Sequence, residues 1–232
     1  MTAVANTHRS AVTAPSMPER SFPDDLLQGY ARFQSGRLDR ERERYRTLAE
    51  EGQRPATMVI ACCDSRAAPE TVFDAGPGEL FVMRNVANLV PPHEPDGGQH
   101  ATLAAIEFAI AGLGVSRIVV MGHARCGGVA AALDAERAPL GPGDYIGQWI
   151  ALLAPEAEHA RAAEFDTPAE RQTATERRAV RGSVERLLAM PQVAEAVREG
   201  RLAVHGAWFD IASGELWVMG PDGGFERAST GA

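Results

Sequence analysis

Short hydrophobic runs alternate along this chain with longer segments of helical spacing, and this alternation limits the fold more than any other feature. The runs that predict strands are residues 57–62, 79–84, 117–122, 201–208 and 215–219. Helices are predicted over 98–113, 126–137, 144–160 and 168–198, the last interrupted at Gly182 and Pro191. Strands separated by helices favour crossover connections and a parallel sheet, whereas residues 210–214 predict a hairpin turn. We therefore expect an α/β fold with a mainly parallel central sheet, about four parallel strands plus an antiparallel edge strand, flanked by helices.

The segment before the first strand predicts an N-terminal helical arm, 22–52. Residues 23–33 and 38–51 have helical spacing, but the second helix is highly charged and has too few apolar residues to be stable alone in water. We expect the arm to pack on another surface, such as a second subunit. Residues 1–20, rich in Ser, Thr, Ala and Pro, predict a disordered tail, and residues 21–225 a single domain that includes the arm.

Composition excludes several classes of function. All 23 basic residues are arginine, so a Schiff-base lysine, a P-loop lysine and a lysine general base are excluded. The net charge of −8 argues against nucleic acid as the main partner. No apolar run is long enough to span a bilayer, so we expect no membrane association. The first twenty residues lack the hydrophobic region of a signal peptide, so we expect a cytoplasmic location.

Two motifs follow two of the predicted strands. Residues 62–66 read Cys-Cys-Asp-Ser-Arg, and residues 123–128 read His-Ala-Arg-Cys-Gly-Gly. Together they offer two thiols, an imidazole and a carboxylate, from Cys62, Cys126, His123 and Asp64, which is a complete ligand set for tetrahedral zinc. Both motifs stand at the carboxyl ends of predicted parallel strands, where open α/β sheets bind ligands. The sequence therefore predicts a zinc site.

Local geometry refines this prediction. Strand alternation places Cys62 and Asp64 on one side and turns Cys63 away, as a buried strand residue. Cys126 should open a helix whose free N–H groups favour a thiolate, and Gly127 lets the backbone approach a ligand. Because the chain has three cysteines, two of them adjacent, we expect reduced thiols rather than a disulfide framework.

The chain resembles the β-class carbonic anhydrases, whose hallmark is Cys-x-Asp-x-Arg followed by His-x-x-Cys. The likeness covers roughly residues 22–220 and includes residues 58–62, 81–88 and 105–109. It implies a lyase that binds one zinc ion per chain and hydrates carbon dioxide reversibly to bicarbonate and a proton by a zinc-bound hydroxide. It also implies a homodimer or higher homo-oligomer with active sites at the subunit interface.

The resemblance assigns roles to the motif residues. Cys62, His123 and Cys126 are implied to be permanent zinc ligands, and the fourth position is taken by Asp64 in a closed form or by water in an active one. Asp64 and Arg66 are the implied catalytic pair, because a salt bridge from Arg66 frees the metal from Asp64. Since two thiolates offset the charge of the ion, we expect activity to rise toward alkaline pH.

Four positions are implied to contact substrate: Gln53, Phe81, Val86 and Gly127. Ala61 and Val59 stand where the bicarbonate-inhibited branch of the family has Gly and Trp, which indicates the plant-like, non-allosteric branch. Phe108 stands where plant enzymes have a tyrosine, so a possible hydrogen-bond donor is missing at that position.

Alternatives remain open at this point. The same ligands serve hydrolysis of carbonyl sulfide or carbon disulfide, or a catalytically silent zinc module that senses bicarbonate. Intact Asp64, Arg66 and Gly127 argue against the silent module, although Asp64 and Arg66 also fit a purely structural ion pair. The sequence does not indicate the pathway, the size of the oligomer, whether Asp64 binds zinc at neutral pH, or a role for Cys63.

Overall fold

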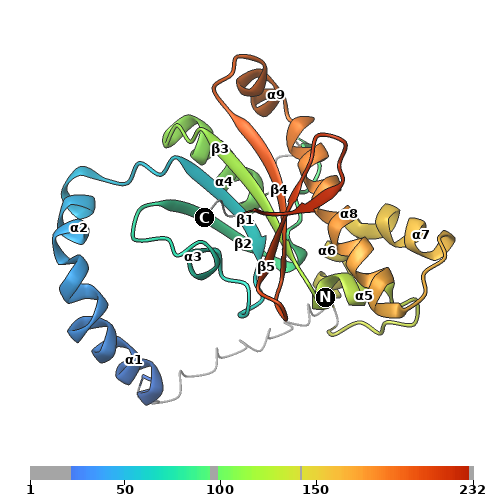
Figure 1. Cartoon of the computed structure of the whole chain (residues 1–232), viewed down its shortest axis with the longest axis horizontal. Coiled ribbons are helices and arrows are strands. Elements are labelled where there is room, and N and C mark those ends of the chain that lie inside the picture. The colour runs from blue at the N-terminus through green and yellow to red at the C-terminus, as the bar shows by residue number, and fades with distance from the viewer. Residues whose placement is uncertain (1–21, 95–98, 142, 230–232) are drawn as a thin grey trace, which may run out of the picture. The chain divides into compact units, whose positions relative to one another are not determined.

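The computed structural model describes residues 22–94, 99–141 and 143–229, and the chain divides into two compact units, Met1–Thr47 and Leu48–Ala232 (Figure 1). The first unit contains α1 (Asp24–Ser35) and most of α2 (Arg37–Glu51), so both predicted helices of the arm are confirmed. Neither helix has a buried residue. The predicted disordered tail lies outside the described residues, and the domain boundaries stay a prediction.

The second unit is built on a six-stranded sheet, counted over the described residues, with the order β2-β1-β3-β4-β5-β6. The strands are β1 (Thr57–Cys62), β2 (Leu80–Asn85), β3 (Arg117–His123), β4 (Ala203–Asp210), β5 (Glu215–Met219) and β6 (Phe225–Arg227). The first four are parallel, as predicted, and β5 pairs antiparallel with β4 through the predicted hairpin at 210–214. The sheet has one antiparallel strand more than predicted, because β6 pairs antiparallel with β5 and extends the sheet past it. With three residues, β6 is too short to show a periodic pattern.

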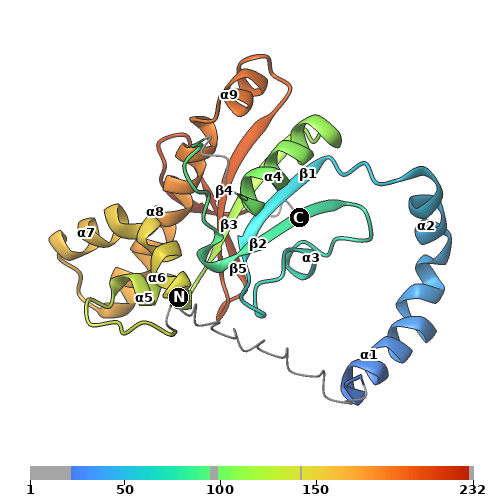
Figure 2. The same ribbon diagram turned by 180° about the vertical axis from the view of Figure 1, so that it is seen from behind.

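Helices connect and cover these strands. They are α3 (Pro69–Val72), α4 (Ala101–Glu107), α5 (Gly127–Leu133), α6 (Tyr145–Ile150), α7 (Ala154–Ala162), α8 (Pro168–Leu188) and α9 (Pro191–Arg198), with short turns η1 (Val86–Asn88), η2 (Phe108–Gly112) and η3 (Ala151–Leu153). Helix α8 packs on β3 and β4, and α5, α6 and α7 gather beside it in both views (Figures 1 and 2). In the described residues no helix is long and apolar enough to cross a membrane.

Three helix predictions need correction. The predicted helix 98–113 is α4 followed by the wider turn η2, in which Leu113 N–H donates to Phe108 O, five residues back. The predicted helix 144–160 is divided into α6, η3 and α7. Pro155 lies in the first turn of α7, where its missing N–H leaves no hydrogen bond back to the preceding turn. Gly182 does not interrupt α8: it is a packing glycine, since a Cβ there would collide with the carboxylate of Glu156.

The core lies on both faces of the parallel strands. On one face the largely buried side chains of β1 and β3 pack against Ile106 of α4 and Val180 of α8. On the other face Val59, Ala61 and Met121 pack with Val72 of α3. Strands covered on both sides need continuous apolar runs, which is the pattern that made β1 and β3 visible in the sequence.

Candidate metal centre

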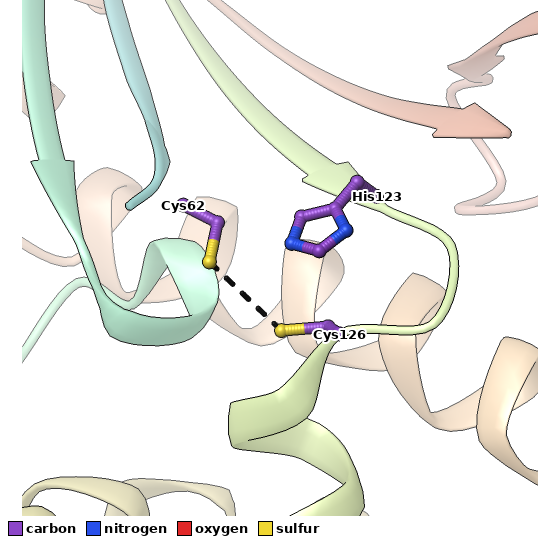
Figure 3. A group of neighbouring side chains, drawn as sticks. All are labelled: Cys62, His123 and Cys126. Atoms are coloured by element: carbon purple, nitrogen blue, oxygen red, sulfur yellow. Dashed lines mark hydrogen bonds between the residues drawn. The ribbon is translucent and has the colours of Figure 1, made fainter. Parts of the chain in front are cut away.

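The two motifs meet where β1 and β3 end. Cys62 is the last residue of β1, His123 is the last residue of β3, and Cys126 immediately precedes α5. The ligand atoms of these three buried residues all lie within 4.8 Å of one another, and the two sulfurs are 4.0 Å apart. Figure 3 shows the imidazole and both sulfurs directed at a common space. In the described part of the chain, this triad is the group of side chains arranged to hold a metal ion.

His123 presents an unused lone pair to this space. Its Nδ1 lies 2.9 Å from the carbonyl oxygen of Ala124. A carbonyl only accepts hydrogen bonds, so we assign the proton to Nδ1 and leave Nε2 as the free acceptor. Nε2 is buried and has no hydrogen-bond partner in the described structure. A buried polar atom without a partner is costly, and a metal ion between Nε2 and the two sulfurs removes that cost.

The thiols of Cys62 and Cys126 act as a pair. The hydrogen bond with the Cys126 thiol, against the effect of burial, lowers the pKa of Cys62, and Ala87 N–H also donates to its sulfur at 3.3 Å. Ala87 reaches this sulfur from a left-handed backbone, φ 64°. The same thiol contact, together with burial, raises the pKa of Cys126. The two sulfurs share a hydrogen bond, and binding of a metal ion would displace the proton that forms it.

A bidentate salt bridge lies beside the triad. Arg66 Nε donates to Asp64 Oδ1 at 2.9 Å and Arg66 Nη2 to Asp64 Oδ2 at 2.8 Å. The Arg66 guanidinium holds the pKa of Asp64 well below its usual range. Asp64 Oδ2 lies 3.9 Å from His123 Nε2, so the carboxylate borders the triad while Arg66 occupies both of its oxygens.

Comparison with known proteins agrees with this geometry. The model of the carbonic anhydrase protein family matches residues 57–216 of this chain. A carbonic anhydrase of Pseudomonas aeruginosa is 37% identical over 207 residues, which are 88% of this chain and 89% of that protein. Beta carbonic anhydrase 5, chloroplastic, of Arabidopsis thaliana is 37% identical over 202 residues, which are 84% of this chain; the match spans 65% of the Arabidopsis protein. The chain belongs to the β-class carbonic anhydrase family.

Solved β-carbonic anhydrases have the same fold. A tetrameric enzyme from Sordaria macrospora superposes with a TM-score of 0.75 at 30% identity, covering 89% of this chain and 98% of that one. The β-carbonic anhydrase CafA of Aspergillus fumigatus gives 0.74 at 29% identity, covering 87% of this chain and 91% of that one. The family uses zinc, and the thiolate–imidazole donor set of the triad is the one that zinc prefers.

Backbone contacts hold the end of β1. Arg84, on the neighbouring strand β2, donates from Nε to Cys62 O at 2.8 Å and from Nη2 to Asp64 O at 2.6 Å. The prediction that Cys63 is a buried strand residue is wrong: β1 ends at Cys62, and Cys63 is exposed. Sequence reasoning missed Arg84, because only strand pairing places it beside residues some twenty positions earlier.

The four predicted substrate residues separate into two places. Val86 packs in the same apolar cluster as Cys62 and Cys126, and Gly127 follows Cys126 directly. A Cβ at Gly127 would meet nothing within 4 Å. The glycine with no room is its neighbour Gly128, where a Cβ would lie 2.8 Å from Val86 Cγ1, a restriction that the sequence analysis did not predict.

Gln53 and Phe81 lie elsewhere in the chain. Phe81 pairs with Met58, whereas Cys62 pairs with Asn85 four residues further along β2, a separation of about 13 Å. Phe81 instead packs against Phe108, with ring centroids 5.9 Å apart. Gln53 is exposed and precedes β1, at the end of the strand opposite Cys62. Within one chain these two residues therefore do not reach the triad.

An apolar cavity of about 570 Å³ opens beside the end of β2. Its lining includes Met83, Asn85, Val86, Thr102 and Trp149, together with the exposed Cys63. Trp149 is fixed there by donating from Nε1 to Val86 O at 2.8 Å. The cavity gives a small nonpolar molecule an apolar surface next to the salt-bridged Asp64 segment.

Proposed function

We propose that this protein hydrates carbon dioxide reversibly to bicarbonate and a proton, with one zinc ion per chain held by Cys62, His123 and Cys126. The observation that carries the proposal is the triad itself: two sulfurs 4.0 Å apart face a buried, unpartnered His123 Nε2. Family membership supports the same reaction. When bound, zinc supplies a Lewis acid that lowers the pKa of water toward neutrality.

The chain's own residues prepare the reaction around that ion. Arg66 keeps Asp64 ionised and holds both of its oxygens, which leaves the fourth side of the triad open to water. Asp64 Oδ2, 3.9 Å from His123 Nε2, borders that open side and is placed to accept a hydrogen bond from the reacting water. Val86 and Trp149 present apolar surface to the nonpolar substrate. Asp64 and Arg66 are thus the catalytic pair of the proposal.

The active form is proposed to be a homodimer or a larger homo-oligomer. Gln53 precedes β1 and Phe81 lies near the start of β2, so both are far from the triad of their own chain and would complete the site of a second copy. The α1 and α2 helices have no buried residues, which leaves their apolar side chains available to a partner. The similar β-carbonic anhydrases of Sordaria macrospora are tetrameric, which supports assembly.

Two finer points stay proposals. The plant-like branch is supported by Ala61 and Val59 and by the Arabidopsis relatives. A cytoplasmic location stays a prediction, since the relatives include a bacterial protein and a plant protein named as chloroplastic. No observation favours carbonyl sulfide or carbon disulfide hydrolysis or the silent module over carbon dioxide hydration.

The test is stopped-flow carbon dioxide hydration on protein whose zinc content has been measured, with Asp64→Ala as the comparison. Fast hydration by the wild type, lost in Asp64→Ala at equal zinc content, supports the reaction and the role of Asp64 together. Zinc-loaded wild type without hydration would refute the proposal, and carbonyl sulfide turnover would then be measured on the same sample.

A further inference from the structure

A buried carboxylate that the catalytic proposal does not use lies behind Cys126. Glu176, on α8, is 3% exposed. Its Oε1 accepts from Cys126 N–H at 2.9 Å, and its Oε2 accepts from Trp208 Nε1 of β4 at 3.1 Å. Glu176 therefore joins the residue before α5 to the middle of the sheet.

Gln172, one turn earlier on α8, completes the contact. Its Nε2 donates to Cys126 O at 3.2 Å and to Glu176 Oε1 at 3.0 Å. Both backbone polar groups of Cys126 are thus bonded to side chains of α8. The loop from β3 to α5 includes Arg125 in a left-handed conformation, φ 55°, so the direction of the Cys126 sulfur depends on how this turn is held.

The setting of Glu176 differs from that of Glu156, which is also buried. Glu156, 6% exposed, faces Arg186 at 3.5 Å in an ion pair. The three donors to Glu176 are neutral: a backbone N–H, an amide and an indole. Buried carboxylates are usually paired with a cation. A buried carboxylate that has only neutral donors lowers the stability of the folded protein. Such residues cluster beside functional sites.

We propose that Glu176 is the positioning residue of the metal centre, fixing the Cys126 backbone so that its sulfur meets zinc together with Cys62 and His123. Gln172 and Trp208 support it, by bonding the same carboxylate and holding it in place. The inference rests on the proposed zinc site but not on turnover, because it concerns the affinity and geometry of metal binding. Outer partners of this kind contribute about 10- to 100-fold to metal affinity.

The variant Glu176→Gln tests the role by counting donors and acceptors. Three N–H groups point at two carboxylate oxygens, and an amide replaces one of those oxygens with another donor. In Glu176→Gln, either Cys126 N–H or Trp208 Nε1 must face an NH2 group. Adding Trp208→Phe removes the indole donor, so the amide can direct its oxygen to Cys126 and its NH2 away from it.

The measurements are the zinc dissociation constant, by chelator competition, and the visible spectrum of the cobalt(II)-substituted protein, which reports thiolate ligation and tetrahedral geometry. We expect Glu176→Gln to weaken zinc binding about 10- to 100-fold and to change the cobalt spectrum. The double variant Glu176→Gln with Trp208→Phe should recover most of the zinc affinity and most of the wild-type cobalt spectrum. Glu156→Gln is the matched control, since it breaks a buried glutamate contact away from the triad and should lower the melting temperature without changing zinc affinity.

Each outcome decides the inference. A folded Glu176→Gln with wild-type zinc affinity and cobalt spectrum overturns it, and so does an equal loss of affinity in Glu156→Gln or no rescue by Trp208→Phe. If Glu176→Gln does not fold, Gln172→Ala is the second variant, with a smaller loss expected and an unchanged affinity overturning the inference. Wild type that binds zinc but does not hydrate carbon dioxide refutes the proposed function alone, whereas wild type that binds no zinc refutes both.

Discussion

The two loops that form the metal centre, residues 62–66 after β1 and 123–126 after β3, are held in opposite ways. The first loop is held by cations: Arg84 bonds its carbonyls and Arg66 its carboxylate. The second is held by a buried carboxylate, Glu176, which bonds its last backbone N–H. The first loop is also partly exposed at Cys63 and Arg66, whereas His123 and Cys126 are 1% exposed.

This difference indicates that the two loops have different roles. A buried loop with both backbone groups of Cys126 bonded is suited to fix ligands. A half-exposed loop with an ionised carboxylate is suited to meet water and substrate, because its charged groups stay solvated. Changes in the second loop should therefore affect metal binding first, and changes at Asp64 and Arg66 should affect turnover first.

The largest effect is expected from Cys126→Ser. A residue that only supports a ligand contributes up to about 100-fold to metal affinity, and loss of a thiolate ligand should weaken zinc binding by more than this. Hydration should fall in proportion to zinc content. Metal analysis after dialysis against a chelator measures this. Cys63→Ser is the matched control, since its exposed thiol lies outside the triad and zinc content should not change. Retention of zinc by Cys126→Ser would contradict the assignment of ligands.

Asp64→Asn should separate turnover from metal binding. The amide cannot form the charge-assisted bidentate pair with Arg66, so we expect kcat/KM for hydration to fall about 100-fold or more. Zinc content should match that of the wild type, because Asp64 lies outside the metal-ligating group. Stopped-flow kinetics and metal analysis on the same sample measure both. Equal loss of zinc and activity would contradict the assignment of metal binding to the second loop and turnover to the first.

The pH profile sharpens the comparison further. The folded pKa of Asp64 is lowered, so its salt bridge is present above the usual aspartate pKa of about 4 and is lost only as pH falls through the lower folded value. The pair is therefore constant from neutral to alkaline pH. Two thiolates offset the charge of zinc, so kcat should still rise over this range. A flat profile from neutral to alkaline pH would contradict this expectation.

Arg84→Gln should have a smaller effect, on stability. A hydrogen bond from a charged donor contributes about 1.5–3 kcal/mol, and Arg84 donates two to the first loop. We expect the free energy of unfolding, measured by urea denaturation of the zinc-loaded protein, to fall by at least about 1.5–3 kcal/mol, the contribution of one such bond. Arg117→Gln, at an exposed position that begins β3, is the control and should stay near the wild type. Equal stability of the two variants would show that Arg84 does not hold the loop.

The smallest effect is expected outside both loops, at Asp144. This residue caps α6 by accepting from Gly147 N–H, and Arg137 lowers its pKa. A lowered folded pKa contributes stability above the usual pKa of about 4 that disappears as pH falls through the folded value. Asp144→Asn should therefore lower the melting temperature slightly at neutral pH, and the difference should vanish in acid. A difference that grows in acid would contradict the assignment.

Much of the fold and of the ligand set could be predicted from local pattern. The runs that form β1 and β3 are apolar throughout because both of their faces are covered, and Cys62 and His123 follow those runs at the strand ends. Errors came where a contact overrides the pattern. Gly182 was predicted to interrupt a helix, but its missing side chain makes room for Glu156. Strand alternation predicted a buried Cys63, but β1 ends one residue earlier, at Cys62.

By itself the sequence determined the alternation of strands and helices and the residue types of the candidate metal site, because these are properties of neighbouring residues. The pairing of Asp64 with Arg66 was implied by the resemblance to the family. Only the tertiary structure decided what holds them: Arg84 from β2 and Glu176 from α8. It also decided that Gln53 and Phe81 lie away from the triad of their own chain. Such contacts join residues twenty to fifty positions apart, and no local periodicity records them.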